Sequence, residues 1–262
     1  MTPIQARFQS LHQQGRTALI PFITAGDPDL GTTRAALQAL DQEGADLIEL
    51  GIPYADPLAD GPVIQAASTR ALRAGTQLPG ILQMLAGMRL QAPVIIFSYY
   101  NPIYQLGIPK FMGEVRWAGG SGVVIPDVPL EESPELREQA QGQGLDWIAL
   151  VAPTSSPARM QAIAAQSSGF IYLVSTTGVT GQRQVLGSRI PGLLGQLRQY
   201  TDLPIGVGFG ISNPEQARQV ADWGADGVIV GSACVQHLAE GGVGALAAFC
   251  RRLRQGLDRR EV

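Results

Sequence analysis

Eight short apolar runs, rich in β-branched residues, recur along the chain at nearly regular intervals and constrain its fold more than any other feature. They lie at residues 19–24, 47–51, 94–99, 122–125, 147–151, 170–174, 205–208 and 227–230. The stretches between them, such as 32–40 and 214–220, space their apolar residues as amphipathic helices do. Strands that alternate with helices form parallel sheets with right-handed crossovers, and eight units of about 30 residues close into a barrel. The sequence therefore predicts an α/β protein with a (β/α)8 TIM barrel.

Three segments extend this plan. Ile4, Phe8 and Leu11 have helical spacing, which predicts an extra N-terminal helix that closes the bottom of the barrel. The connections after the second and sixth strands are long, at residues 52–62 and 175–190. In this architecture the strand-to-helix connections form the catalytic face, and long ones can act as lids that exclude water.

Composition excludes several classes of protein. No linker or low-complexity tract divides the 262 residues, so residues 1–262 are expected to form a single domain. A net charge of −3 gives no attraction to nucleic acid or to an anionic membrane. No apolar run approaches the length of about 18 residues that a membrane span needs, and no signal-peptide pattern opens the chain. Cys234 and Cys250 fall in helical segments, so we expect no disulfide framework and a cytoplasmic protein.

The chain is poor in side chains that carry covalent or metal-assisted catalysis. Lys110 is its only lysine, and His12 and His237 are its only histidines. A Schiff base needs a lysine in the pocket, and a metal site needs converging ligands. We interpret all three residues as exposed helix residues, so the sequence predicts neither a Schiff base nor a metal site.

Two carboxylates are candidates for proton transfer. Glu49 lies in the nearly apolar run 47–51, where strand alternation directs its side chain into the barrel. Burial is costly for a charge and raises the pKa of a carboxyl group toward the range useful for acid–base catalysis. Asp60 ends the loop that follows the same strand, which brings both groups to one rim. The alternatives are a structural pairing of Glu49 with an arginine and a turn or helix-cap role for Asp60.

Glycine-rich pieces follow three of the expected strands, at residues 178–181, 208–212 and 231–233. Backbone N–H groups there, together with a helix that starts near Ser232, can bind a phosphate without a basic side chain. The loops after strands seven and eight are the usual phosphate site of this fold. Aromatic residues at strand ends, among them Phe22, Tyr99 and Tyr172, suit a flat apolar pocket, although each alone also suits the core.

Three motifs resemble the tryptophan synthase alpha subunit family: IPFITAGDP at 20–28, ELGIPYADPLADGP at 49–62 and GFGIS at 208–212. The second motif is long and therefore far more specific than a bare glycine pattern. The resemblance spans nearly the whole chain. It implies cleavage of indole-3-glycerol phosphate to indole and glyceraldehyde 3-phosphate, a step of tryptophan biosynthesis.

The resemblance also implies roles for individual residues. Glu49 matches the family's general acid/base, Asp60 the carboxylate that holds the indole N–H, and Tyr172 an active-site aromatic residue. The substrate pocket would be lined by Phe22, Phe97, Tyr99, Leu150 and Tyr172, with Thr180 as the lid threonine that meets Asp60. The phosphate contacts would come from Gly181, Gly210, Gly231 and Ser232.

The family's chemistry requires no cofactor in this chain, because protonation of indole C3 turns the ring itself into the electron sink. Pyridoxal phosphate belongs to the beta subunit, with which the resemblance implies an αββα heterotetramer. A stand-alone indole-3-glycerol phosphate lyase would use the same residues without a partner. Two further alternatives are a sugar-phosphate isomerase or epimerase on the same barrel, and a regulatory subunit without catalytic activity.

Overall fold

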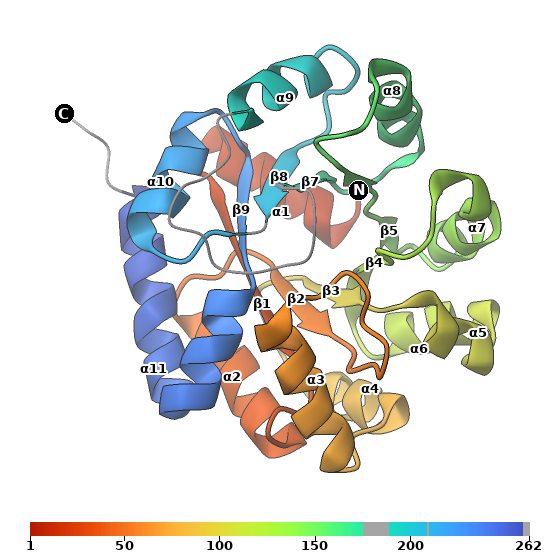
Figure 1. Ribbon diagram of the computed structural model, residues 1–262, viewed down its shortest axis with the longest axis vertical. Helices are drawn as coiled ribbons and strands as arrows, with labels where there is room; N and C mark the ends of the chain where they lie inside the picture. Colours follow the sequence, from red (N-terminus) through yellow and green to blue (C-terminus); the bar gives the residue numbers. More distant parts are fainter. Residues whose placement is uncertain (175–188, 209, 259–262) are drawn as a thin grey trace.

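The computed structural model describes residues 1–174, 189–208 and 210–258. In these ranges a curled parallel sheet is surrounded by helices (Figure 1). The strands are β1 (Ala18–Thr24), β2 (Ile48–Gly51), β3 (Val94–Phe97), β4 (Gly120–Val124), β5 (Asp146–Trp147), β6 (Leu150–Val151), β7 (Ile171–Val174), β8 (Ile205–Gly208) and β9 (Gly227–Val230). Their order in the described sheet is β5-β4-β3-β2-β1-β9-β8-β7-β6.

The sheet begins and ends on neighbouring parts of one segment. β5 pairs with β4, and β6 pairs with β7, so residues 146–151 supply both ends of the ladder. Between them, the Ile148 N–H donates to the Val123 carbonyl at 3.1 Å and the Ala149 carbonyl accepts from Tyr172 N–H at 3.0 Å. The predicted single strand 147–151 is therefore wrong in detail, because hydrogen bonding passes from β4 to β7 within it. The predicted (β/α)8 barrel is confirmed.

Apart from the N-terminal α1, the helices of the described ranges follow the strands around the outside of the sheet. They are α1 (Pro3–Gln13), α2 (Leu30–Gln42), α3 (Pro62–Arg73), α4 (Leu78–Ala86), α5 (Tyr100–Leu106), α6 (Ile108–Trp117), the 3-10 turn η1 (Leu130–Glu132), α7 (Pro134–Gly142), α8 (Pro157–Gln166), α9 (Ile190–Leu197), α10 (Pro214–Asp222) and α11 (Ser232–Asp258). Several begin with proline in the first turn, where its missing N–H costs nothing. No helix among the described residues is both long and apolar enough to cross a bilayer.

The core consists of two apolar layers separated by the sheet. Ile48 and Leu50 of β2 face outward and join the layer beneath the helices. Leu47 lies in the inner layer inside the barrel, together with Phe22 and Ile95. Alternation along β2 therefore directs Glu49 inward as well, as the sequence pattern indicated.

Helix α1 packs against the inner layer. A capping box between Thr2 and Gln5 fixes its start, and Ile4, Phe8 and Leu11 are buried. The Phe8 ring lies 5.5 Å from the ring of Phe170, which precedes β7. The contact places α1 at the end of the barrel where the strands begin.

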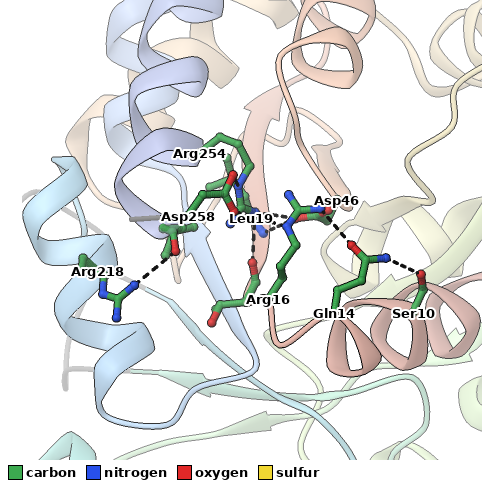
Figure 2. A network of polar contacts seen from close by, with 10 residues as sticks. Ser10, Gln14, Arg16, Leu19, Asp46, Arg218, Arg254 and Asp258 are labelled. Carbon is green, nitrogen blue, oxygen red and sulfur yellow. Dashed lines mark hydrogen bonds and ion pairs between the residues drawn. The ribbon is translucent and has the colours of Figure 1, made fainter. Parts of the chain in front are cut away.

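A polar network holds the same end of the barrel (Figure 2). Arg254 of α11 donates to the carboxylate of Asp46 at 2.9 Å, to the Thr17 carbonyl at 3.0 Å and to Asp258 at 2.7 Å. Asp46 also accepts the N–H of Leu19 at 2.9 Å. Only 8% of the Arg254 side chain and 7% of the Asp46 side chain are exposed, so this ion pair is buried. It ties the last helix to the entrances of β1 and β2.

Candidate active site

Glu49 occupies the middle of the barrel wall. It is in register with Phe22 of β1 and Ile95 of β3, and 1% of the residue is exposed. Among the described residues, its Oε1 atom has no hydrogen-bond partner and no arginine forms an ion pair with it. The predicted alternative, a structural ion pair, is therefore not found there. Burial raises the pKa of Glu49 from 4.5 to about 8, so the group keeps its proton near neutral pH.

Asp60 lies at the end of the loop between β2 and α3. Its N–H donates to the Pro57 carbonyl at 3.0 Å, and 4% of the residue is exposed. Helix α3 is capped by Gly61 and receives no side-chain cap, so the Asp60 carboxylate is free of that role. Burial raises the pKa of Asp60 to about 6, while a hydrogen-bonding contact with the Tyr99 side chain acts to lower it. Near neutral pH this carboxyl group is mostly ionised.

Tyr172 of β7 lies within electrostatic reach of both carboxyl groups. Burial raises its pKa well above the ordinary value of 10.0, and the charges of Glu49 and Asp60 add to the shift. Gly208 of β8 makes room for the ring, because a Cβ atom there would lie 2.6 Å from the Tyr172 hydroxyl. The structure thus gathers two carboxyl groups with opposite protonation states and one neutral phenol inside the barrel.

Aromatic side chains continue along one wall of this interior. The rings of Phe22 and Phe97 meet edge to face with centroids 5.6 Å apart, and the Tyr99 ring lies 6.4 Å beyond Phe97. Leu150 is half-buried and packs against the same inner layer. These residues, which the resemblance implied as substrate contacts, therefore lie in or against one apolar layer.

Two members of this wall were not predicted from the sequence. Tyr54 packs against Tyr99 with tilted rings whose centroids lie 5.3 Å apart, and Ile64 of α3 belongs to the inner layer. Tyr54 stands inside the long motif at 49–62 and could have been found there. Ile64 carried only the ordinary apolar spacing of a helix, which does not indicate that it faces the barrel interior.

The predicted phosphate site is described in part. Gly210 has φ 85°, a conformation that favours glycine. Ser232 begins α11 and is buried, and Gly231 precedes it. A Cβ atom on Gly231 would contact Phe22 and Ile64 at 3.7 to 3.8 Å, so this glycine lies beside the aromatic wall. Thr180 and Gly181, with the rest of 175–188, lie outside the described residues.

Together, the barrel and its pair of buried carboxyl groups define a (β/α)8 enzyme of the acid–base type. Residues 8–256 match the family model of the tryptophan synthase alpha chain. The chain is 61% identical to the tryptophan synthase alpha chain of Synechococcus elongatus, with 100% of this chain and 99% of the relative covered. It is 57% identical to that of a Synechocystis strain, with 98% of this chain and 100% of the relative covered. This chain belongs to the tryptophan synthase alpha chain family.

Solved structures agree with this membership. A chain of tryptophan synthase from Mycobacterium tuberculosis superposes with a TM-score of 0.93 at 37% identity, covering 99% of each chain. Tryptophan synthase subunit alpha from Legionella pneumophila gives a TM-score of 0.88 at 36% identity, covering 98% of this chain and 99% of that one. The fold and the family are therefore supported over nearly the full length.

Proposed function

We propose that Glu49 and Asp60 carry the reaction of the family, in which indole-3-glycerol phosphate is cleaved to indole and glyceraldehyde 3-phosphate. The chain is a lyase of tryptophan biosynthesis. The observation that carries the assignment of residues is the contrast between the two buried carboxyl groups, whose pKa values are raised to about 8 and about 6. Two titratable groups held in different protonation states suit separate acid and charge-stabilising roles.

The first step uses the proton that burial keeps on Glu49. Its transfer to indole C3 leaves a cationic ring, and the Asp60 carboxylate stabilises the positive charge at the ring N–H. Glu49, now ionised, takes the proton from the hydroxyl group on the adjacent side-chain carbon. The carbon–carbon bond then breaks, its electron pair returns to the ring, and an aldehyde forms. No cofactor in this chain is needed for this sequence of steps.

The substrate would fit between the aromatic wall and the glycine-rich strand ends. Phe22, Phe97, Tyr99, Leu150 and Tyr172 would surround the indole ring, with Thr180 from the loop after β7. Gly181, Gly210, Gly231 and Ser232 would hold the phosphate. Gly210 has a positive φ, so Gly210→Val would strain the backbone at that turn and displace the N–H groups proposed to hold the phosphate. We expect this variant to have a higher KM and weaker binding of glyceraldehyde 3-phosphate by calorimetry.

We further propose that the chain works in the cytoplasm with a pyridoxal-phosphate beta subunit, as an αββα heterotetramer. Family membership supports this partner, as does the likeness to a chain of tryptophan synthase from Mycobacterium tuberculosis. Asp56 and Pro57 stand on the loop that carries Asp60, so a partner bound at that face could act on the active site. If a conformational change favoured by the partner limits the reaction, coupling of about 1–3 kcal/mol would raise the cleavage rate about 5- to 150-fold.

One assay separates these proposals from their alternatives. Purified chain is mixed with indole-3-glycerol phosphate, and release of indole is followed with and without a beta subunit. Stimulation by the beta subunit supports the heterotetramer, whereas full activity without any response to it indicates a stand-alone lyase. Absence of indole release under both conditions would contradict the proposed activity and favour a regulatory subunit or a different barrel enzyme.

A further inference from the structure

We infer that Asp127 is a positioning residue for Asp60, acting through the start of α5 and the side chain of Tyr99. This inference rests on the role proposed above for Asp60. Asp127 follows β4, whereas Asp60 follows β2, so the connection joins two separate strand-to-helix loops.

The first link runs from Asp127 to helix α5. Both oxygens of its carboxylate accept the N–H of Tyr100, the first residue of α5, at 3.0 and 3.1 Å. The N-cap residue of this helix is Tyr99, which provides no side-chain cap. In most helices the N-cap residue itself, a Ser, Thr, Asp or Asn, accepts such an N–H, but here Asp127 accepts it from a loop after another strand. The Asp127 carboxylate also places a negative charge at the positive end of the helix dipole. Asp127 thereby fixes where α5 begins.

The second link runs from that helix start to the Asp60 loop. Tyr99 is 2% exposed, and its ring is flanked by Tyr54 and Phe97. Its hydroxyl oxygen accepts the N–H of Ala59 at 3.1 Å, and the hydroxyl group contacts the carboxylate of Asp60. One phenol thus anchors both the backbone beside the catalytic carboxylate and the carboxylate itself.

The charges around Tyr99 keep its hydroxyl group a donor. Burial raises the pKa of Tyr99 above its ordinary value, and the charges of Asp60 and Asp127 add to this shift. The phenol therefore stays neutral and can donate to Asp60, while Ala59 occupies its acceptor side. Among the described residues, Glu49, Tyr172 and Tyr54 are further titratable groups around this site, and the Tyr54 ring packs against that of Tyr99. Burial keeps Glu49 protonated and Tyr172 neutral near pH 7, and Tyr99 is the group whose contact lowers the pKa of Asp60.

Three variants of the full-length chain test the connection. Tyr99→Phe keeps the ring and removes the hydroxyl group, Asp127→Ala removes the acceptor for Tyr100, and Asp127→Asn keeps an acceptor oxygen. The pKa of Asp60 is measured by carbon NMR of labelled aspartate, with the signal assigned by its loss in Asp60→Asn. We expect the pKa to rise in Tyr99→Phe and Asp127→Ala, because the contact that lowers it is lost or displaced. We also expect kcat to fall about 10- to 100-fold with little change in KM.

The controls distinguish positioning from general damage to the fold. Asp41 likewise accepts backbone N–H groups, those of Gln91 and Ala92, but at the opposite end of the barrel. Asp41→Ala should lower the thermal stability by a similar amount but leave the Asp60 pKa and kcat unchanged. Tyr104 is an exposed tyrosine of α5, so Tyr104→Phe should also leave the Asp60 pKa and kcat unchanged. Asp127→Asn should recover most of the rate that Asp127→Ala loses.

Two results would overturn the inference. One is an unmoved Asp60 pKa in Asp127→Ala, whatever Tyr99→Phe does. The other is a loss of kcat in Asp127→Ala that Asp41→Ala reproduces. Full activity of Asp60→Asn would instead contradict the proposed function of Asp60. The NMR titration does not depend on catalysis, so the titration would still decide whether Asp127 and Tyr99 set the pKa of Asp60.

Discussion

Asp46 and Glu49 stand three positions apart along one strand segment and are both buried, yet their surroundings are opposite. Asp46, at the entrance of β2, has an arginine partner and a backbone N–H donor. Glu49, in the barrel interior, has an Oε1 atom without a partner among the described residues. Burial raises the pKa of both groups, but at Asp46 the Leu19 N–H and the charge of Arg254 oppose that rise.

The difference shows that burial of a charge does not by itself indicate catalysis. A buried carboxylate with a complete set of partners ties elements together, as Asp46 does for α11 and the starts of β1 and β2 (Figure 2). A buried carboxyl group without such partners has a raised pKa, because its charged form is poorly stabilised. It therefore gains and loses its proton near neutral pH. The strand entrances of this barrel thus hold the paired carboxylate, and its interior and strand exits hold the carboxyl groups proposed for catalysis.

The largest expected effect comes from Glu49→Gln, which removes proton exchange and keeps the shape. We expect kcat to fall about 10²- to 10⁴-fold, with the fold retained. The pKa of Glu49 in the folded protein is about 8, above its ordinary value of 4.5. The wild type therefore loses stability as the pH rises from about 4.5 to about 8. Thermal melts from pH 5 to 9 should show Glu49→Gln gaining stability relative to wild type as pH rises. Near-normal turnover at saturating substrate would reduce Glu49 to a structural residue.

Arg254→Met tests the opposite end of the comparison, because it leaves the Asp46 carboxylate without its partner. Urea denaturation should show a loss of about 3–5 kcal/mol in the free energy of unfolding, while kcat of the folded protein stays unchanged. Arg251→Met is the matched control, since 57% of the Arg251 side chain is exposed and its ion pair with Glu43 should contribute much less than the buried pair. Equal losses in the two variants would contradict the role given to the buried pair.

The pH dependence of kcat/KM sharpens the comparison within the active site. Asp60 must be ionised and Glu49 protonated, so activity should be highest between about pH 6 and pH 8. Below this range kcat/KM should fall about tenfold per pH unit. The substrate phosphate also titrates below about pH 6, so Asp60→Asn serves as the control. This variant should be slower, but the part of the fall in kcat/KM at low pH that is due to Asp60 should be absent from its profile. An identical acid limb in the variant would assign that limb to another group.

Gly208→Ala should give the smallest effect. The added Cβ atom would lie 2.6 Å from the Tyr172 hydroxyl, so the ring must move away from its place beside the two carboxyl groups. We expect kcat/KM to fall several-fold and stability to drop by about 1–3 kcal/mol. Gly113→Ala, in α6 with nothing within 4 Å of its Cβ position, is the control and should not reduce activity. A Gly208→Ala enzyme with wild-type kinetics would show that the position of Tyr172 is not critical.

Much of this arrangement could be predicted from local patterns. The recurrence of apolar runs gave the barrel, and alternation along 47–51 gave the inward direction of Glu49, because strand geometry fixes side-chain direction from sequence alone. The neighbouring position of Asp60 followed from its loop. The split of residues 146–151 into β5 and β6 could not be predicted, because it depends on which neighbour each half of the segment contacts after the barrel closes.

The sequence by itself therefore determined the order of elements, the family, and which carboxyl groups are the candidates for catalysis. Only the tertiary structure decided which buried charges are paired. Arg254 meets Asp46 across 208 positions of the chain, and Tyr99 meets Ala59 across 40. No local pattern encodes such contacts, because they depend on the closed barrel bringing distant segments within hydrogen-bond distance. These contacts distinguish the paired Asp46 from Glu49, the proposed acid, and join Tyr99 to the loop that carries Asp60.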